Sequence, residues 1–522
     1  MEQFIPLKEK IESLVQEHYN KDFLYFENKK YTYQEMDNQV NKLVNGLVKN
    51  GVKKGSKVVL MLPSSDFFVF CLLANIKIGA ITVPINLDHR GVSLEYIIKQ
   101  SEAEYLIYTN KSHKQLINIQ NNIQNIKQII TFNVDDINKK QWKIPVIESE
   151  NFFENESNKI EFTLSLAHKN DIMEIIYTSG TTGPPKGVVW NQQKFNTNIA
   201  EDIGFTSSDI MYTPLPLFHA LAQRMLFMCL INGATIALKS KFSASEFWED
   251  INKYKATWFN YIGAIIPILL KQHPHPQDKY QNAKFAYGCG APQDENVWNE
   301  FSERFKVKLF EYYGTTEAGA ITLGNKPGSI GTQRNSQNVK IVGENNQECS
   351  TGEIGELLSK SHDPKHAFKG YYKLKEESEE KMSGDWIKSG DLVYKDNEGF
   401  YYFVGRKVES MRRRGENISP WEIESVVNSH PKVLESAAIP IPSDVGEDEV
   451  KVYVVLKNNK YLSEESLLNH CEHEMATYLI PRYIEFLDEL PKTSTEKIER
   501  VKLKREGINK NTWDSSLKQR VK

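Results

Sequence analysis

Cysteine is scarce and unpatterned in this chain. Five cysteines occur in 522 residues, and no two of them have the CxxC spacing of zinc ribbons or dithiol redox motifs. They stand at Cys71, Cys229, Cys289, Cys349 and Cys471. An odd number of scattered cysteines argues against a disulfide or zinc framework and favours reduced thiols in a cytoplasmic protein.

The chain also lacks an excess of charge of either sign. It has 65 Lys and Arg residues against 68 Asp and Glu residues, for a formal net charge of −3. A general nucleic-acid binder needs a basic surface to neutralise phosphates, so we do not expect a nucleic-acid partner. A local basic pocket for a small phosphorylated ligand remains compatible with this balance.

Long uninterrupted hydrophobic runs are missing as well. The mostly apolar stretch 67–85 contains Lys77 and Gly79 and ends in β-branched residues. A membrane-spanning helix needs about 20 apolar residues, so we interpret this stretch as a buried helix followed by a buried strand. The segment 1–17 mixes Lys and Glu in a helical pattern and has no apolar signal core. We therefore expect no membrane span.

The length and pattern of the chain predict at least two domains. Roughly 100–200 residues make one typical domain, and this chain has 522. In the first part, helical segments (33–50, 66–77, 94–101) alternate with β-branched runs (57–62, 80–84, 105–108). This βαβ rhythm predicts parallel strands with helices on the faces of the sheet.

The pattern changes in the last third of the chain. Short strands separated by Gly, Asn and Asp turns run from 338 to 404, which predicts a small antiparallel barrel or sheet. Helices and strands alternate again, on a smaller scale, from 407 onward. We therefore predict an α/β fold. Its large N-terminal domain, 1–406, has parallel-rich sheets flanked by helices and a small β-barrel-like subdomain, and a small mobile α+β domain, 407–522, follows.

The strongest local signal is the segment 175–189, which reads IIYTSGTTGPPKGVV. A buried strand enters a loop of Gly, Ser and Thr that is closed by Lys186. Glycines let backbone N–H groups approach an anion, hydroxyls add donors, and lysine supplies a compact positive charge. The loop is not a Walker A motif, because Pro185 precedes the lysine and Gly187 follows it. We interpret it as a phosphate cradle in preference to a flexible surface turn. Its candidate nucleotide-binding residues are Thr178, Ser179, Gly180, Thr181, Thr182, Gly183 and Lys186.

Several later segments complete a pattern in a fixed order. They are GCGAP at 288–292, YGTTE at 313–317, SGD at 389–391, GR at 405–406 and LPKTSTEKIER at 490–500. Together with the phosphate loop, they resemble the motifs of the adenylate-forming superfamily of acyl- and aryl-CoA synthetases, peptide synthetase adenylation domains and firefly luciferase. The resemblance covers nearly the whole chain. It implies an AMP-binding domain, a mobile C-terminal domain, and the use of ATP, Mg²⁺ and coenzyme A.

The resemblance implies a role for each nucleotide motif. Tyr313 stacks on adenine, Thr316 bonds the α-phosphate and Glu317 holds Mg²⁺; an aromatic face suits a purine and a carboxylate suits a hard cation. Asp391 accepts hydrogen bonds from the ribose, and Arg406 reaches the ribose or a phosphate. The adenine loop contributes Gly290, Ala291 and Pro292, followed by Gly314. Taken alone, YGTTE would favour an aromatic turn with a solvated glutamate. The glycine loop and the Asp391–Arg406 pair, taken alone, are equally compatible with a plain turn and a surface ion pair.

The segment 216–220, PLFHA, resembles the part of the family that lines the acyl pocket. We expect His219 to line and gate that pocket, although a lone histidine is more often a satisfied core residue. The pocket candidates are His219, Tyr261, Gly263, Gly288, Gly314 and Ala318. They provide an aromatic ring and small residues, but no carboxylate that would select an amino or quaternary ammonium substrate.

The C-terminal motif places the mobile catalytic lysine of the family at Lys497. A cation aimed at both an attacking carboxylate and a phosphate lowers the barrier between two anions. Two positions depart from the family. Glu496 replaces the usual Gly before this lysine, and Val408 stands at the hinge, where relatives carry Asp or Lys. These departures put the polar anchoring of the hinge and the setting of the lysine in doubt.

The segment 411–420, MRRRGENISP, resembles the loop that completes the thioester-forming site. The fixed donor fork of arginine suits the phosphates of coenzyme A, and a solvated basic face is an equal alternative. The candidate residues for coenzyme A are Arg412, Arg413, Arg414 and Gly415.

These patterns predict an AMP-forming acyl-CoA ligase with Lys497, Glu317, Thr316 and His219 as catalytic residues. The segments 218–223, FHALAQ, and 414–419, RGENIS, look most like carnitine/crotonobetaine and short-to-medium acyl-CoA ligases. One alternative is a stand-alone adenylation enzyme that loads the phosphopantetheine arm of a carrier protein. A further alternative, suggested by Glu496 and Val408, is a catalytically weakened adenylate-binding protein. We expect a small-molecule carboxylic acid as substrate, and a monomer or homodimer.

Overall fold

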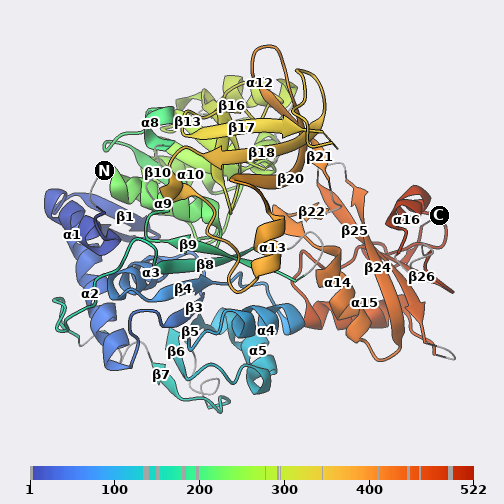
Figure 1. The fold of residues 1–522 in the computed structure, drawn as a ribbon, viewed down its shortest axis with the longest axis horizontal. Coiled ribbons are helices and arrows are strands. Elements are labelled where there is room, and N and C mark those ends of the chain that lie inside the picture. The colour runs from blue at the N-terminus through green and yellow to red at the C-terminus, as the bar shows by residue number, and fades with distance from the viewer. Residues whose placement is uncertain are drawn as a thin grey trace.

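The computed structural model has a large lobe and a smaller C-terminal lobe, the latter drawn in orange and red in Figure 1. The structure describes residues 4–132, 134, 140–148, 153, 156–178, 184–194, 199–276, 278–290, 293, 295–343, 345–407, 411–443, 447–457, 460–491 and 498–521. The helices of the large lobe are α1 (Leu7–Glu17), α2 (Tyr33–Lys49), α3 (Asp66–Ile78), α4 (Gly91–Gln100), α5 (His113–Ile119), α8 (Ile199–Ile203), α9 (Ala220–Ile231), α10 (Phe247–Lys253), α11 (Ile265–Leu270), α12 (Glu295–Phe305) and α13 (Lys375–Glu380).

The first sheet of the large lobe has nine strands in the order β16-β15-β14-β13-β12-β10-β11-β1-β2. The six inner strands from β14 to β1 pair in parallel, and the outer strands pair antiparallel. Their bounds are β1 (Asp22–Phe26), β2 (Lys29–Thr32), β10 (Ile210–Thr213), β11 (Thr235–Leu238), β12 (Trp258–Ile262), β13 (Phe285–Cys289), β14 (Lys308–Thr315), β15 (Gly319–Gly324) and β16 (Thr332–Gln333).

The second sheet has seven strands in the order β7-β6-β5-β3-β4-β8-β9, all parallel except the β8–β9 hairpin. Its strands are β3 (Lys57–Met61), β4 (Ile81–Pro84), β5 (Tyr105–Thr109), β6 (Gln128–Phe132), β7 (Val146–Glu148), β8 (Ile172–Thr178) and β9 (Lys186–Asn191). The βαβ rhythm in the sequence is therefore confirmed as two parallel-rich sheets.

Helix α3 lies between these sheets, where it contacts β1 of the first and β3 and β4 of the second. Ser65 caps its start, Gly79 ends it in a left-handed conformation (φ 79°), and every residue between is buried. Lys77 is tolerated there because its ammonium lies 2.5 Å from a carboxylate oxygen of Asp37 and 2.8 Å from the amide oxygen of Asn41. The predicted buried helix followed by a strand is thus confirmed. Among the described helices, none has the length and apolar character required to cross a bilayer.

A third sheet extends the large lobe towards the C-terminal lobe. It is antiparallel throughout, as the turn-rich segment predicts, and the C-terminal lobe has hydrophobic cores of its own. The third sheet consists of β17 (Gln337–Val342), β18 (Gly355–Ser361), β19 (Met382–Ser383), β20 (Trp386–Lys395) and β21 (Tyr401–Arg406). The C-terminal lobe contains β22 (Met411–Arg413), β23 (Glu416–Ile418), α14 (Pro420–Ser429), β24 (Val433–Pro442), β25 (Asp448–Leu456), α15 (Glu464–Glu474), β26 (Tyr483–Leu487), α16 (Arg500–Glu506), β27 (Trp513–Asp514) and β28 (Gln519–Arg520). The exact boundary at 406/407 stays a prediction; it falls between the end of β21 and the start of β22.

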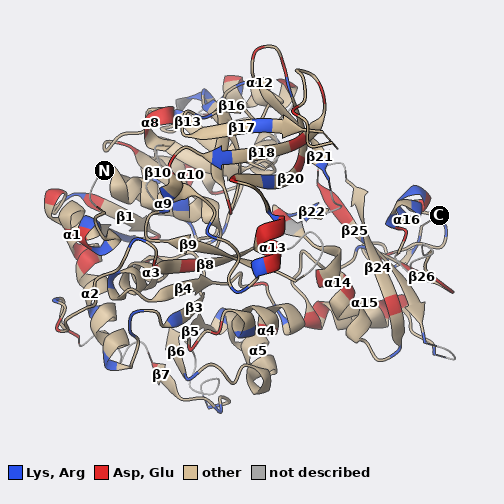
Figure 2. Cartoon of the chain, in the orientation of Figure 1, with Lys and Arg blue, Asp and Glu red and all other residues tan. Residues whose placement is uncertain are grey.

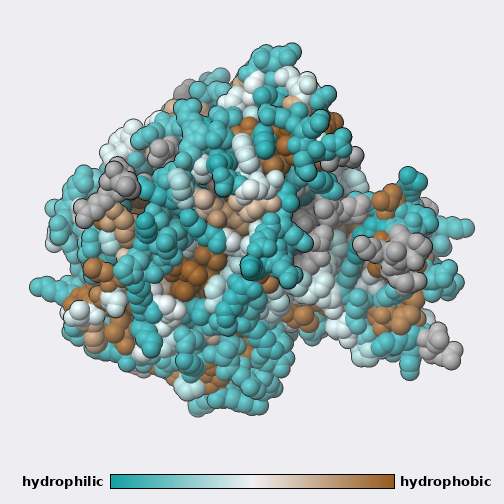
Figure 3. Space-filling model, viewed as in Figure 1, coloured by the Kyte–Doolittle hydropathy of each residue, from teal (hydrophilic) through white to brown (hydrophobic). Residues whose placement is uncertain are grey.

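Charged residues of both signs are interleaved over both lobes in Figure 2, in line with the balanced composition. The face shown in Figure 3 is mainly hydrophilic, with smaller hydrophobic patches. Several described motif residues stand at or just after the ends of parallel strands, with Thr178 at the end of β8, Gly290 after β13, and Thr316 and Glu317 after β14. Ligand sites of open α/β sheets lie outside the carboxyl ends of the strands.

Candidate active site

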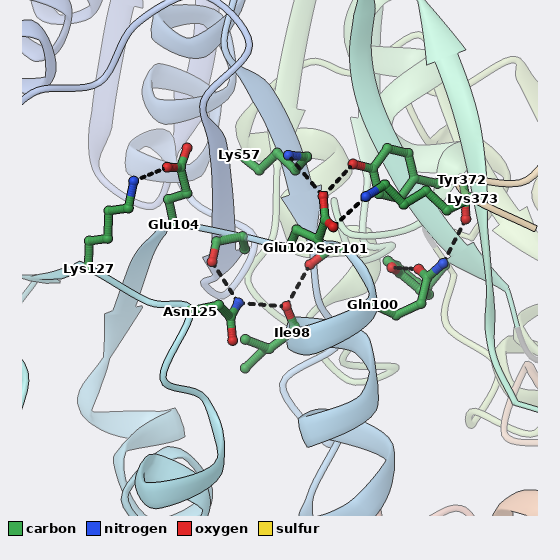
Figure 4. Close-up of polar contacts among 12 residues, drawn as sticks. Lys57, Ile98, Gln100, Ser101, Glu102, Glu104, Asn125, Lys127, Tyr372 and Lys373 are labelled. Atoms are coloured by element: carbon green, nitrogen blue, oxygen red, sulfur yellow. Dashed lines mark hydrogen bonds and ion pairs between the residues drawn. The ribbon is translucent and has the colours of Figure 1, made fainter.

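A short segment, 370–374, ties the third sheet to the strands around the phosphate loop. Tyr371 forms a bridge with Val188, and the backbone N–H of Tyr372 donates to the carbonyl of Gly187 at 2.7 Å. At the far end of the segment, the Gln100 side chain donates to the Tyr372 carbonyl at 2.6 Å, and Lys373 pairs with Glu102 (Figure 4). The segment is therefore fixed at both edges.

This segment delivers Tyr371 to Glu317, the predicted magnesium ligand. The Tyr371 hydroxyl donates to Glu317 Oε1 at 2.6 Å, and the ammonium of Lys381 lies 3.6 Å from the same oxygen. Burial acts to raise the pKa of Glu317, but Lys381 and the Tyr371 hydroxyl outweigh it, so the pKa is lowered overall. The side chain is therefore a carboxylate at neutral pH, as a ligand of Mg²⁺ must be.

Three side chains hold the backbone of the YGTTE turn. Trp190 Nε1 donates to the Thr316 carbonyl at 3.1 Å and Lys194 Nζ donates to the Glu317 carbonyl at 2.9 Å. Arg224 Nη2 makes a long contact of 3.4 Å with the Thr315 carbonyl. Burial, with the nearby charge of Arg224, lowers the pKa of Lys194 to about 7. Successive carbonyls of the turn thus have separate donors, which fixes the direction of the Thr316 and Glu317 side chains.

Both ends of the phosphate loop lie beside this turn. Thr178 and Lys186 are paired across the β8–β9 hairpin, and Lys186 Nζ lies 5.4 Å from the centre of the Tyr371 ring. The loop residues between them, Ser179, Gly180, Thr181, Thr182 and Gly183, lie outside the described residues. The structure brings the ends of the loop to Glu317 through Tyr371.

The predicted nucleotide residues also meet. The Tyr313 hydroxyl donates to Asp391 Oδ2 at 2.5 Å, and Arg406 Nε lies 2.9 Å from Asp391 Oδ1. Asp391 and Arg406 are register partners on β20 and β21. At position 314 glycine is required, because a Cβ there would lie 2.2 Å from the Gly319 carbonyl oxygen. Ala291 and Pro292 lie outside the described residues; Gly290 is described and has φ 104°.

The predicted acyl-pocket residues lie at the ends of β12, β13 and β14. Tyr261, Gly288 and Glu311 are register neighbours, and a Cβ at position 288 would lie 2.3 Å from the Tyr261 ring. The Tyr261 hydroxyl donates to Glu311 Oε2 at 2.7 Å. Burial raises the pKa of Glu311 to about 8. The backbone N–H of Gly263 donates to the carbonyl of Cys289, and the backbone N–H of Ala318 donates to Thr315 Oγ1 at 3.0 Å. The carboxyl of Glu311 was not among the predicted residues.

The β22–β23 hairpin of the C-terminal lobe docks on these strand ends. Its turn residues, Arg414 and Gly415, have φ values of 55° and 80°, which suits a two-residue hairpin turn with both residues left-handed. A Cβ on Gly415 would lie 2.3 Å from Ile262 Cδ1. A Cβ on Gly290 would lie equally close, at 2.3 Å, to Arg412 Nη2. Both glycines therefore permit close contact between the lobes.

Glu416 links the docked hairpin to His219. Glu416 Oε1 lies 2.8 Å from His219 Nε2 and accepts a hydrogen bond from the Asn86 side chain at 3.1 Å. Burial acts to lower the pKa of His219, but the charge and hydrogen bond of Glu416 outweigh it and raise the pKa above its ordinary value. The His219 side chain keeps 42% of its surface exposed, and it lines a cavity of about 40 Å³ between the lobes. A cavity of that size holds a few water molecules.

The three predicted coenzyme A arginines have different surroundings. Arg413 pairs with Glu449 at 2.7 Å and donates to the Ile480 carbonyl at 2.6 Å, so it holds the hairpin to its own lobe. Arg412 reaches across to Gly290 in the large lobe, and Arg414 is exposed at the turn.

Lys497, Glu496 and Val408 lie outside the described residues. On either side of the gap that contains Lys497, Leu490 and Ile498 pack on a hydrophobic core of the C-terminal lobe. Arg500 pairs with Glu424 of the same lobe at 2.7 Å. The chain that flanks the predicted lysine is therefore anchored in the C-terminal lobe.

Several contacting residues escaped the sequence reasoning. Tyr371 is 54 positions from Glu317 and stands in no recognised motif, and the same holds for Lys381 and Arg224. Glu416 is different, because it stands inside the segment RGENIS, whose resemblance to related ligases could have identified it as a site residue.

We predict that Tyr371→Phe weakens Mg·ATP binding by about 10- to 100-fold, because a hydrogen bond to a charged group is lost. Without the hydroxyl, the pKa of Glu317 rises. The pH below which Mg·ATP binding weakens is therefore higher in the variant. Isothermal titration of Mg·ATP between pH 5 and 8 measures both effects.

Tyr372→Phe is the matched control. Its hydroxyl bonds Glu102 at 3.1 Å on the surface, away from Glu317 (Figure 4). Equal losses in the two variants would show that Tyr371 does not act through Glu317.

Comparison with known proteins agrees with this geometry. The family model described as "AMP-binding enzyme" matches residues 11–372, and the model of the AMP-binding enzyme C-terminal domain matches 422–497. The crotonobetaine/carnitine–CoA ligase of Escherichia fergusonii is 32% identical over 491 residues, covering 91% of this chain and 93% of the relative. The ligase of the same name from Shigella flexneri is also 32% identical, with the same coverage.

Two solved structures of o-succinylbenzoate CoA synthetase from Bacillus subtilis resemble this chain, one more closely than the other. A double mutant bound to a CoA product analogue has a TM-score of 0.82 at 25% identity, covering 95% of this chain and 98% of that chain. The complex with ATP and magnesium has a TM-score of 0.67 at 26% identity, covering 95% and 99%. From its motifs, its site and these similarities, the chain belongs to the AMP-binding enzyme family.

Proposed function

We propose that this chain is an AMP-forming acyl-CoA ligase, which activates a carboxylic acid with ATP and transfers the acyl group to the thiol of coenzyme A. The observation that carries the proposal is that Tyr313, Asp391 and Arg406 meet at the end of β14, while the β22–β23 hairpin docks at the ends of the neighbouring strands β12 and β13. A nucleotide site and a second lobe that closes on it are what a two-step ligase needs.

In the first step, a carboxylate oxygen of the acid forms a bond to the α-phosphorus of ATP, and pyrophosphate leaves with the electrons of the broken P–O bond. Tyr313 holds the adenine, Asp391 the ribose, and Lys186 with the Thr178–Gly183 loop the β- and γ-phosphates. Thr316 contacts the α-phosphate.

Magnesium fits the described residues as an ion shared with the nucleotide. Within the described ranges, no group of three His, Cys, Asp or Glu side chains is arranged to hold a metal. Mg²⁺ is commonly bound by one or two carboxylates together with substrate phosphates, and Glu317 supplies such a carboxylate. When bound, the ion offsets the charge of the phosphates.

In the second step, the thiol sulfur bonds to the acyl carbon of the adenylate, the thiol loses its proton, and AMP leaves with the electrons of the C–O bond. The docked hairpin supports this step, with Arg412, Arg414 and Gly415 next to the strand ends. The greater similarity to the CoA product-analogue complex than to the Mg·ATP complex supports the same assignment of the domain orientation. Adenylate formation, the first step, needs the other orientation, in which rotation about Val408 brings Lys497 to the nucleotide.

The acid is expected to be short or medium in length, and the names of the curated relatives make carnitine-like acids the first candidates. Loading of a carrier protein in trans is the second function to test, and a weakened adenylate-binding protein is the third. A cytoplasmic location and a monomeric or homodimeric state stay predictions.

A panel of carboxylic acids assayed for pyrophosphate release, with and without coenzyme A, tests the proposal. We expect at least one acid to give CoA-dependent AMP and thioester. Release that needs a phosphopantetheinylated carrier protein would favour the second function. Measurable ATP binding with no acid-stimulated exchange would favour the third.

We predict that Lys497→Ala slows adenylate formation at least about 100-fold, because the cation between carboxylate and phosphate is lost. Thiolysis of a supplied acyl-adenylate should stay within about threefold of the parent rate, since the lysine serves only the first orientation. The two half-reactions are measured separately, by pyrophosphate exchange and by thioester release. Survival of both would show that Lys497 is wrongly assigned.

We predict that Glu416→Gln slows thiolysis by about three- to tenfold and spares adenylation, because a half-exposed ion pair contributes little more than about 1 kcal/mol. The raised pKa of His219 means that the docked orientation is favoured while His219 is protonated, and the advantage is lost as pH rises through that pKa. In the variant, the decline of the thiolysis rate with rising pH should begin at a lower pH. Glu465→Gln, at an exposed position of α15, is the control. A profile identical to that of the control would contradict the link.

A further inference from the structure

Arg224 on helix α9 is a buried cation that lacks a carboxylate partner. Its side chain and backbone together are only 6% exposed. Its guanidinium carbon lies 5.4 Å from the centre of the Trp190 ring, and its one hydrogen bond is the 3.4 Å contact with the Thr315 carbonyl. It forms no ion pair with any residue in the described ranges. Buried arginines are normally paired, since an isolated buried charge is strongly unfavourable.

The guanidinium lies at the inner wall of the predicted acyl pocket. A Cβ on Gly319 would lie 3.5 Å from Arg224 Nη2, and Gly319 follows the pocket residue Ala318. The positive charge of Arg224 also acts on the thiol of Cys289, which follows the pocket residue Gly288. It acts on the hydroxyls of two more residues at these strand ends, Tyr287 and Tyr312. Arg224 is therefore enclosed by the ends of β13 and β14 and the start of β15.

Three acids of this region form no ion pair with Arg224. Glu311 is committed to the Tyr261 hydroxyl, and burial raises its pKa to about 8. Glu174 accepts a hydrogen bond from Gln223, the residue before Arg224, and burial raises its pKa to about 8 as well. Burial thus favours the uncharged form of both carboxyls, whereas arginine cannot lose its proton in a protein. Glu317 already forms an ion pair with Lys381. The wall therefore carries net positive charge.

We propose that Arg224 binds a second carboxylate of the acid that is activated, so that the substrate class is a dicarboxylic acid of which one carboxyl becomes the thioester. The planar guanidinium offers paired N–H donors that match a carboxylate, and its Nε and Nη1 have no hydrogen-bond acceptor among the described residues. The inference rests on the proposed ligase activity and specifies its substrate. A quaternary ammonium group at the same wall would meet a like charge in a site of low dielectric. The inference therefore favours dicarboxylic acids over the carnitine-like acids that the names of the relatives suggest.

The test compares three acids at each of several chain lengths: a monocarboxylate, the α,ω-dicarboxylate, and the acid with a terminal trimethylammonium group. CoA-dependent pyrophosphate release gives kcat/KM for each. For the parent protein we expect the dicarboxylate of the preferred length to exceed its monocarboxylate by about 10- to 100-fold, the range for a charge-assisted hydrogen bond. Arg224→Met should remove that preference and raise the relative rate of the trimethylammonium acid. Arg224→Lys keeps the positive charge but lacks the paired N–H donors of the guanidinium, so it should retain part of the preference for the dicarboxylate.

Arg505→Met, at an exposed position of α16, is the matched control and should leave all ratios unchanged. A parent enzyme that prefers monocarboxylates or trimethylammonium acids at every length would overturn the inference while leaving the ligase activity in place. A rise in the KM for ATP that is equal for every acid in Arg224→Met would assign Arg224 to the nucleotide instead. If no acid releases pyrophosphate with coenzyme A, the proposed function fails, and this inference fails with it. The ratios of the parent protein decide the question even where a variant does not fold.

Discussion

The hydrogen bond from Tyr371 to Glu317 is the contact on which the rest of the site depends, because it joins all three sheets of the large lobe. Glu317 follows β14 of the first sheet, while Tyr371 stands in a segment that leaves the third sheet and pairs with β9 of the second. A magnesium nucleotide that uses the phosphate loop, Glu317 and Asp391 touches the same three sheets. Binding therefore needs their relative placement to be fixed in advance, which the Tyr371 segment and its contacts at Gln100 and Glu102 achieve (Figure 4).

The docked hairpin adds a second constraint, which concerns the order of events. Its contacts with the large lobe involve glycines at 290 and 415, where a Cβ would require the Arg412 or Ile262 side chain to shift, and the Glu416–His219 pair. A half-exposed ion pair contributes little, so this docking is readily reversed. Weak docking suits an enzyme whose two steps need different groups at one nucleotide. A tight interface here would hold the C-terminal lobe in one orientation and stop the cycle.

The sequence predicted the elements and the motif residues better than it predicted their support. The βαβ rhythm, the buried helix with its following strand and the antiparallel third sheet are local patterns, and all were confirmed. The partners of Lys77, Asp37 and Asn41, lie 40 and 36 positions away, and Tyr371 lies 54 positions from Glu317, so no local pattern indicates them. The three consecutive arginines looked alike in sequence. Only the fold separates Arg413, which is tied to Glu449, from Arg412 at the lobe interface.

The same limit explains why a family name does not fix the acyl group. The nucleotide motifs are shared by the family, whereas Arg224, Glu311 and Tyr261, which line the proposed acyl pocket, stand between motifs. Burial has different effects on the charge of a carboxyl and of a guanidinium. A buried carboxyl without a cation escapes the cost of desolvation by taking up a proton, and arginine has no such escape. A pocket that contains both kinds of group is therefore not neutral near pH 7, even when its formal charges balance. The residual positive charge needs an anion, and the proposal assigns that role to a second carboxylate of the acid.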